Sequence, residues 1–410
     1  MLSFVFRLFL FILLSSSCQT MKPVSNRNLA FHYTSGFPIE VKGKVLEIGE
    51  DLSVFIQINF RKLSAISDFR NIWDKYLMVY TLSKDYESYN FQYQDTLGPG
   101  HRINPSVNPL VLFLKLPKTE KNRLLSISIK EKQGTETYIF DIPIREDEPG
   151  NMKACLFDKN GRYPVFNNYI SSVDTVILRT FSFASEDPEL EFHPFNKSVA
   201  LPPMAAVPTS ANDFDISYKV KFSVNQRTVF KEPGYYFLSS TQYDKQGFGF
   251  IVTEPYFPMV TKPMDLIDPM IYISTREERK NLMEASNQKL ALDQFWLKTN
   301  SLKDVARRLI KSYFENIEAA NTFFSSHKAG WKTDQGMVLA IYGPPPIVYK
   351  NWDLEIWQYD KSMGLENSVF YFNRKNYIKD PNVWELKRFN EYDRVWYGVV
   401  ELWRKGVINR

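Results

Sequence analysis

The sequence has few of the residues that form disulfides and metal sites. Its 410 residues include two cysteines, Cys18 and Cys155, and four histidines. If Cys18 is modified, as argued below, Cys155 has no partner for an internal disulfide. The histidines lie in different segments, and none is followed by a metal-ligating residue at positions i+2 to i+4. We therefore predict no metal and no cofactor.

Sequence signatures of catalysis and of nucleic-acid binding are also missing. There is no G-x-S-x-G elbow, no G-x-x-x-x-G-K phosphate loop and no block of Lys and Arg. The 51 basic residues nearly balance the 46 acidic ones, for a formal charge of +5. We therefore predict no catalytic residue, and we do not expect nucleic acid as a partner.

The apolar run near the N-terminus is short. Residues 8–14 follow Arg7 and precede Ser15-Ser16-Ser17-Cys18. A run of this length does not cross about 30 Å of hydrocarbon. Its order of positive charge, apolar centre and small residues is typical of a secretory signal, here residues 1–17.

A cysteine directly after the small residues resembles a lipoprotein signal, which implies that Cys18 is the lipid attachment site. Ser15 departs from that motif, where Leu is commonest. Simple secretion and a retained signal anchor therefore remain as alternatives. Residues 18–39 are expected to form an N-terminal linker.

Period-two hydrophobicity dominates the next two segments. It is clearest at Val54, Ile56, Ile58 and Phe60, at Leu125, Ile127 and Ile129, and at Ile216, Tyr218, Val220, Phe222 and Val224. Alternation of this kind indicates β-strands with one buried face. We predict an immunoglobulin-like β-sandwich over residues 40–145 and a second β-rich module over residues 151–255, with residues 216–224 as one half-buried strand.

The pattern changes at Pro255, Pro258, Pro263 and Pro269, and residues 256–273 are expected to be a linker. Apolar residues then recur every three or four positions between Val305 and Phe324, which predicts an amphipathic helix. Ser274 with Glu277 is expected to form a capping box before it. Residues 354–359, 368–373 and 395–403 are aromatic-rich and are predicted as β-like segments. An α+β domain over residues 274–410 follows.

The segment Gly330-Trp331-Lys332-Thr333-Asp334-Gln335-Gly336, continued by residues 337–342 and by Gly343-Pro344-Pro345, resembles the defining motif of the GWxTD domain family. Residues 315–324 and the Trp357 strand also look like that family, so the resemblance covers about residues 275–410. Gln335 and Pro346 depart from the pattern. A weaker similarity of element order points to the small lipoprotein subunit of the outer-membrane β-barrel assembly machine.

The motif can also be interpreted from local chemistry. Thr333 can cap a short helix, Asp334 complements the helix dipole, and Gly343 with the prolines can end the helix. Residues 337–342 also alternate, so a strand is an alternative there. Asp334 can instead be a catalytic or binding carboxylate working with His327; the structural interpretation is preferred, with His327 in an exposed turn.

The last 60 residues contain five of the eight tryptophans, which form either a domain core or an aromatic binding surface. Together these features predict an envelope lipoprotein that acts as a non-catalytic scaffold in outer-membrane assembly or secretion. It would be held by its lipid on the outer membrane, facing the periplasm, and would bind other envelope proteins. The alternative is an envelope hydrolase or glycan-binding protein with a site near Asp334.

Overall fold

The computed structural model describes residues 24–25, 27–61, 72–87, 93–104, 108–118, 121–146, 152–181, 188–206, 216–240, 243–299, 302–360, 367–375, 379 and 383–407. The expected signal segment and Cys18 lie outside these ranges. Within the described ranges, no helix has the length and apolar character needed to cross a membrane.

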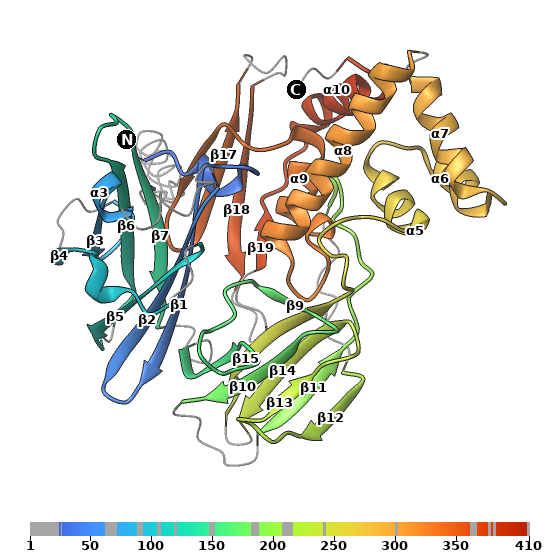
Figure 1. Cartoon of the computed structure of the whole chain (residues 1–410). Helices are drawn as coiled ribbons and strands as arrows, with labels where there is room; N and C mark the ends of the chain where they lie inside the picture. The colour runs from blue at the N-terminus through green and yellow to red at the C-terminus, as the bar shows by residue number, and fades with distance from the viewer. Residues whose placement is uncertain are drawn as a thin grey trace, which may run out of the picture.

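The first β-rich region contains two antiparallel sheets, with strand orders β1-β2-β5 and β4-β3-β6-β7 (Figure 1). Its strands are β1 (Ile39–Ile48), β2 (Asp51–Phe60), β3 (Tyr76–Ser83), β4 (Tyr93–Thr96), β5 (Leu110–Pro117), β6 (Arg123–Glu131) and β7 (Thr137–Ile144), with a short helix α3 (Ile72–Lys75) before β3.

The inner faces of these two sheets pack into one hydrophobic core. Val54, Ile56 and Ile58 are fully buried, as their alternation with polar residues predicts. They share the core with Ile127 and Ile129 of the opposite sheet. The prediction of several antiparallel sheets in this region is confirmed, and its immunoglobulin-like character stays a prediction.

The second β-rich region also has two sheets, in the orders β13-β10-β8 and β12-β11-β14-β15-β9, and only β15 and β9 pair in parallel among the described strands. The strands are β8 (Ala154–Phe157), β9 (Tyr169–Ser171), β10 (Thr175–Thr180), β11 (Glu189–His193), β12 (Tyr218–Lys221), β13 (Arg227–Val229), β14 (Gly234–Ser240) and β15 (Tyr243–Thr253).

The strand expected over residues 216–224 is shorter and more exposed than predicted. Only Tyr218–Lys221 forms β12, and all four of its residues are exposed. The reason is its place at the edge of the five-stranded sheet, opposite a sheet of three strands. Alternation alone does not distinguish a central strand from an edge strand.

The C-terminal region combines helices with a four-stranded antiparallel sheet, β16-β17-β18-β19, which confirms the predicted α+β class. Its elements are α5 (Pro263–Ile267), η3 (Asp268–Tyr272), α6 (Arg276–Glu284), α7 (Gln288–Thr299), α8 (Lys303–Phe324), η4 (Gly330–Lys332), α9 (Asp334–Tyr342), β16 (Ile347–Lys350), β17 (Leu354–Tyr359), β18 (Ser368–Lys375), β19 (Val383–Leu386) and α10 (Tyr392–Lys405).

Helix α8 buries the predicted apolar stripe, including Leu309, Tyr313 and Ile317. The capping box of α6 is shifted by one residue from the prediction. Thr275 accepts a hydrogen bond from the Glu278 N–H, and Glu278 accepts one from the Thr275 N–H. Both pairs, 274/277 and 275/278, have the right spacing, so the sequence pattern does not separate them.

The prediction of a β-like segment over residues 395–403 is wrong, because these residues belong to α10. Trp396, Val400 and Trp403 recur at helical spacing and are buried on one face. Gly406, with φ of 67°, supplies the left-handed residue that ends the helix. Aromatic enrichment suggested a strand, but the spacing of the buried residues determines a helix.

Both segments expected to be linkers contribute buried side chains to the C-terminal core. Leu29 joins that core, and its N–H donates to the Val348 carbonyl of β16. The Ser25 N–H makes the equivalent bond to Lys350. In the second segment, Ile267 and Met270 are fully buried. The chain before β1 therefore extends the hydrogen bonding of the C-terminal sheet at its β16 edge.

Candidate functional site

The turn from η4 into α9 contains most of the residues singled out in the sequence. Thr333 caps α9, since its Oγ1 accepts the Gly336 N–H at 3.0 Å and its hydroxyl donates to the Gly330 carbonyl at 2.7 Å. Residues 334–342 form a buried helix, so the alternative of a strand at 337–342 is wrong. A threonine cap and a run of small and aliphatic residues explain why the helix begins here.

Two glycines of the motif are required by close backbone approach. A Cβ on Gly330 would lie 1.9 Å from the carbonyl oxygen of Ala320 in α8. A Cβ on Gly336 would lie 1.9 Å from the carbonyl oxygen of Gly330 itself. Helix α8, the η4 turn and α9 therefore interlock through their backbones, and any side chain at these two positions would separate them.

Trp331 anchors the turn in the core, with 6% of its surface exposed. Its ring meets Tyr272 of η3 edge-on at 6.0 Å, and the Tyr272 hydroxyl donates to the Trp331 carbonyl at 2.9 Å. The indole thus joins η4 to the segment that had been expected to be a linker.

Asp334 makes an ion pair rather than facing an open cleft. Its carboxylate accepts two bonds from Arg388, at 2.6 and 3.0 Å, and one from the Leu386 N–H at 2.7 Å. Both charged side chains are 11% exposed. A bidentate pair of this kind fixes the start of α9 against the end of β19.

The motif also contacts the second β-rich region. Arg388 donates to the Leu201 carbonyl at 3.1 Å, and the Ala200 N–H donates to the Lys332 carbonyl at 2.9 Å. His327, expected in an exposed turn, is 2% exposed, and its carbonyl accepts the Asn196 N–H. The turn is buried because the segment containing Asn196 and Ala200 bonds across it, a contact that local sequence does not show.

The exit from α9 follows the predicted chemistry. Gly343 has φ of 70°, and Pro344 and Pro345 follow it. The Gly343 carbonyl accepts a hydrogen bond from the Tyr359 hydroxyl at 2.8 Å.

Trp357 is fully buried in the core, together with Trp396 and Trp403. These tryptophans therefore serve mainly as core.

These contacts define one compact unit, and its sequence can be compared with known families. Residues 234–405 match the GWxTD domain. The match covers less than half of the chain and reaches back to Gly234, so it takes in β14 and β15 as well as the region from residue 275. No curated protein and no solved structure matches the chain.

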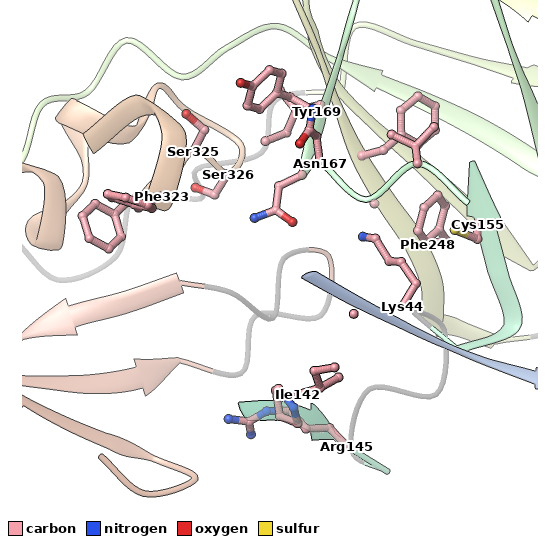
Figure 2. A pocket seen from close by; sticks show the side chains of 18 of the residues that line it. Lys44, Ile142, Arg145, Cys155, Asn167, Tyr169, Phe248, Phe323, Ser325 and Ser326 are labelled. Carbon is pink, nitrogen blue, oxygen red and sulfur yellow. The ribbon is translucent and has the colours of Figure 1, made fainter. Parts of the chain in front are cut away.

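A cavity of about 400 Å³ lies where the GWxTD domain meets both β-rich regions. Figure 2 shows Lys44 of β1 and Asn167, which precedes β9, with their side chains directed into its centre, and Ser325 and Ser326 at its edge. Arg145 lies at the opposite edge, where its guanidinium donates to the Trp352 carbonyl at 2.9 Å. Neither Thr333 nor Asp334 lines this cavity.

One wall of the cavity carries a buried acid. Glu355 is 1% exposed and accepts bonds from the Trp357 indole at 2.9 Å and the Gln335 amide at 3.3 Å. Gln335 thus has a structural partner. Burial, together with Glu355, raises the pKa of the neighbouring Tyr33 hydroxyl well above its usual value. Tyr33 therefore stays neutral.

Sequence reasoning missed Lys44, Lys350 and Glu355. The only local signal was a charged residue inside an apolar strand, as in Leu354-Glu355-Ile356-Trp357. A charge in such a position must have a buried partner or face a cavity. Among the described residues, no three His, Cys, Asp or Glu side chains are grouped so that they could hold a metal ion.

Proposed function

We propose that this protein is a non-catalytic scaffold of the cell envelope. Cys18 would carry a lipid that holds the protein on the outer membrane, facing the periplasm. The folded body would bind envelope proteins in outer-membrane assembly or secretion. The observation that supports this most strongly is the use of the motif's polar groups in internal bonds.

An enzyme with its site at Asp334 would present that carboxylate to a substrate. Here Arg388 and the Leu386 N–H take up both carboxylate oxygens, and Thr333 is engaged as a cap. The geometry therefore favours a motif that holds the domain together over the alternative of a hydrolase or glycan site near Asp334.

The strand order of the first region supports a docking module. We propose an immunoglobulin-like sandwich here, and the division of seven antiparallel strands into two facing sheets, β1-β2-β5 and β4-β3-β6-β7, supports it. Modules of this type present loops and sheet edges on a rigid body. Their usual roles in extracellular chains are spacing and protein recognition, which fits a scaffold.

The segment before β1 supports a short tether. Ser25 and Leu29 are bonded to β16 of the GWxTD domain. From Cys18 to Val24 the chain can span at most about 20 Å. An acylated Cys18 would thus hold the GWxTD domain close to the bilayer surface, which would favour partners that are themselves in or on the membrane.

Palmitate labelling tests the anchor. We expect label to enter the parent protein and the control Cys155→Ala, and not to enter Cys18→Ala, which should leave the membrane fraction. The anchor would be contradicted if the parent protein took up no palmitate label. It would also be contradicted if Cys18→Ala fractionated with membranes as the parent does.

Affinity purification tests the scaffold. Full-length tagged protein would be cross-linked in intact cells, extracted in detergent and purified beside the Cys18→Ala variant. We expect outer-membrane assembly or secretion components to copurify with the parent in fixed proportion. Isolation of the parent as a lone monomer after cross-linking would count against the proposal.

A further inference from the structure

The cavity at the junction of the three regions is lined by two lysines that make no ion pair within 4.0 Å with any residue that the structure describes. Lys44, half-buried on β1, makes no hydrogen bond or ion pair with any residue that the structure describes. Its neighbour Lys42, by contrast, is paired with Glu40 at 3.0 Å and donates to Asn167 at 2.8 Å. The ammonium group of Lys44 is therefore free to meet a ligand in the cavity.

Lys350 of β16 supplies the second positive charge. Its ammonium lies 5.8 Å from the centre of the Tyr86 ring and forms no ion pair within 4.0 Å inside the described part of the chain. Burial alone would lower the pKa of Lys350, but Tyr86, Glu355 and Asp141 together raise it. Lys350 therefore stays charged. Together with Lys44 and Arg145 it outnumbers Glu355, the one acidic side chain among the described lining residues, so the cavity walls favour an anion.

The remaining walls combine amides with aromatic rings. Asn167 and Asn168 offer carboxamides, which donate and accept hydrogen bonds. Tyr169, Phe248 and Trp384 offer apolar ring surface. Amides beside aromatic rings suit a ligand that has both hydroxyl groups and apolar C–H faces, as a sugar ring has. A purely aliphatic ligand would displace water from these amides without replacing its hydrogen bonds.

Two glycines allow the segments that form the cavity walls to pack closely. A Cβ on Gly43 would lie 2.5 Å from the Ile142 side chain, so its absence lets β1 approach β7 at the cavity wall. A Cβ on Gly249 would lie 1.8 Å from the Tyr235 hydroxyl. The volume of about 400 Å³ falls in the range of small-ligand pockets, about 300–1,000 Å³.

We propose that this cavity binds a small acidic sugar, of the size of a uronic-acid disaccharide. One of its carboxylates lies between Lys44 and Lys350, and the hydroxyls bond the Asn167 and Asn168 amides. This site is separate from Asp334 and does not depend on lipid attachment. Through this cavity the scaffold would bind an acidic glycan at the junction of its three regions.

Calorimetric titration of the whole soluble chain with digalacturonic acid tests the proposal. The neutral disaccharide galactobiose and the acyclic anion citrate are titrated beside it. We expect digalacturonic acid to bind at least about tenfold more tightly than either, because only it combines charge with sugar hydroxyls.

Three variants locate the binding. Lys44→Gln should weaken it about tenfold or more, and the exposed Asn168→Trp should abolish it by filling the cavity mouth. Lys115→Gln removes the same charge from an exposed position on β5 of the same sheet and should change affinity less than about twofold. Unchanged thermal unfolding shows that a variant is folded, and if Asn168→Trp does not fold, Lys44→Gln decides alone.

Several results would overturn the proposal. Absence of heat with digalacturonic acid does so, as does equal binding of galactobiose, which removes the role of charge. Equal binding of citrate makes the site a general anion site and not a sugar site. Full affinity in Lys44→Gln would place the ligand elsewhere.

Discussion

The ion pair between Asp334 and Arg388 makes the structural interpretation of the motif quantitative. Three hydrogen bonds reach one carboxylate, and each of the two side chains is only 11% exposed, so water screens the pair weakly. Removing one partner of such a pair leaves the other charge buried, which costs about 3–5 kcal/mol when burial is complete. Given the residual exposure, we expect Asp334→Ala to lower the free energy of unfolding of the GWxTD domain by about 3 kcal/mol.

A double-mutant cycle with Arg388→Met isolates the pair itself. We expect a coupling energy of about 2 kcal/mol, because the double variant no longer contains an unpaired charge. Lys311 and Glu315 provide the matched control. Their charged groups lie 3.8 Å apart, but the two side chains are 77% and 61% exposed. Their coupling energy should therefore be about 0.3 kcal/mol.

Urea unfolding followed by tryptophan fluorescence is the assay. Seven of the eight tryptophans lie between Trp296 and Trp403, so the signal reports the C-terminal region. The reasoning would be refuted if Asp334→Ala stayed within about 0.5 kcal/mol of the parent, or if the two couplings were equal. Either result would return Asp334 to consideration as a functional carboxylate.

Three further changes have defined outcomes. Gly336→Ala should destabilise the domain by about 3 kcal/mol or prevent folding. Gly398 lies on the exposed side of α10, where an added Cβ would meet no atom within 4 Å, so Gly398→Ala should stabilise the domain by about 0.5 kcal/mol. Urea unfolding measures both changes. The Arg404 hydrogen bonds lower the pKa of Glu278 to about 2, so this carboxylate contributes stability above its unfolded pKa of about 4.5, and the contribution is lost as the pH falls towards 2. The difference in Tm between the parent and Glu278→Gln should therefore disappear between about pH 5 and pH 2. A difference that does not depend on pH would contradict the pairing. Burial raises the pKa of the Cys155 thiol to about 11, so iodoacetamide should modify this thiol slowly at pH 8 in the native chain and rapidly in urea. Mass spectrometry follows the modification. Fast labelling of the native chain would show that the Cys155 thiol is accessible to solvent.

Short-range patterns were enough for much of the C-terminal region. The spacing of apolar residues predicted α8, because a helix that packs on a core must bury one stripe. Thr333, Gly343 and the two prolines marked both ends of α9 correctly, because caps and positive-φ residues act within a few residues.

The errors have a common physical origin. Residues 395–403 were predicted as β-like from their aromatic content, yet α10 buries Trp396 against Tyr342 of α9 and Trp403 against Tyr313 of α8. His327 was expected in an exposed turn, yet a strand-connecting segment from the second β-rich region covers it. In both cases the deciding partner is distant in sequence.

The sequence by itself determined where the chain turns, caps and alternates, because those preferences arise from the backbone and from near neighbours. It therefore determined the order of β-rich and α+β regions and the two ends of the motif's helix, while the choice of helix over strand for residues 337–342 came from the structure. Only the tertiary structure decided that Asp334 meets Arg388, that Gly330 and Gly336 touch neighbouring backbone, and that Lys44 and Lys350 face one cavity. Those relations depend on contacts between residues far apart in the chain, which no local pattern records.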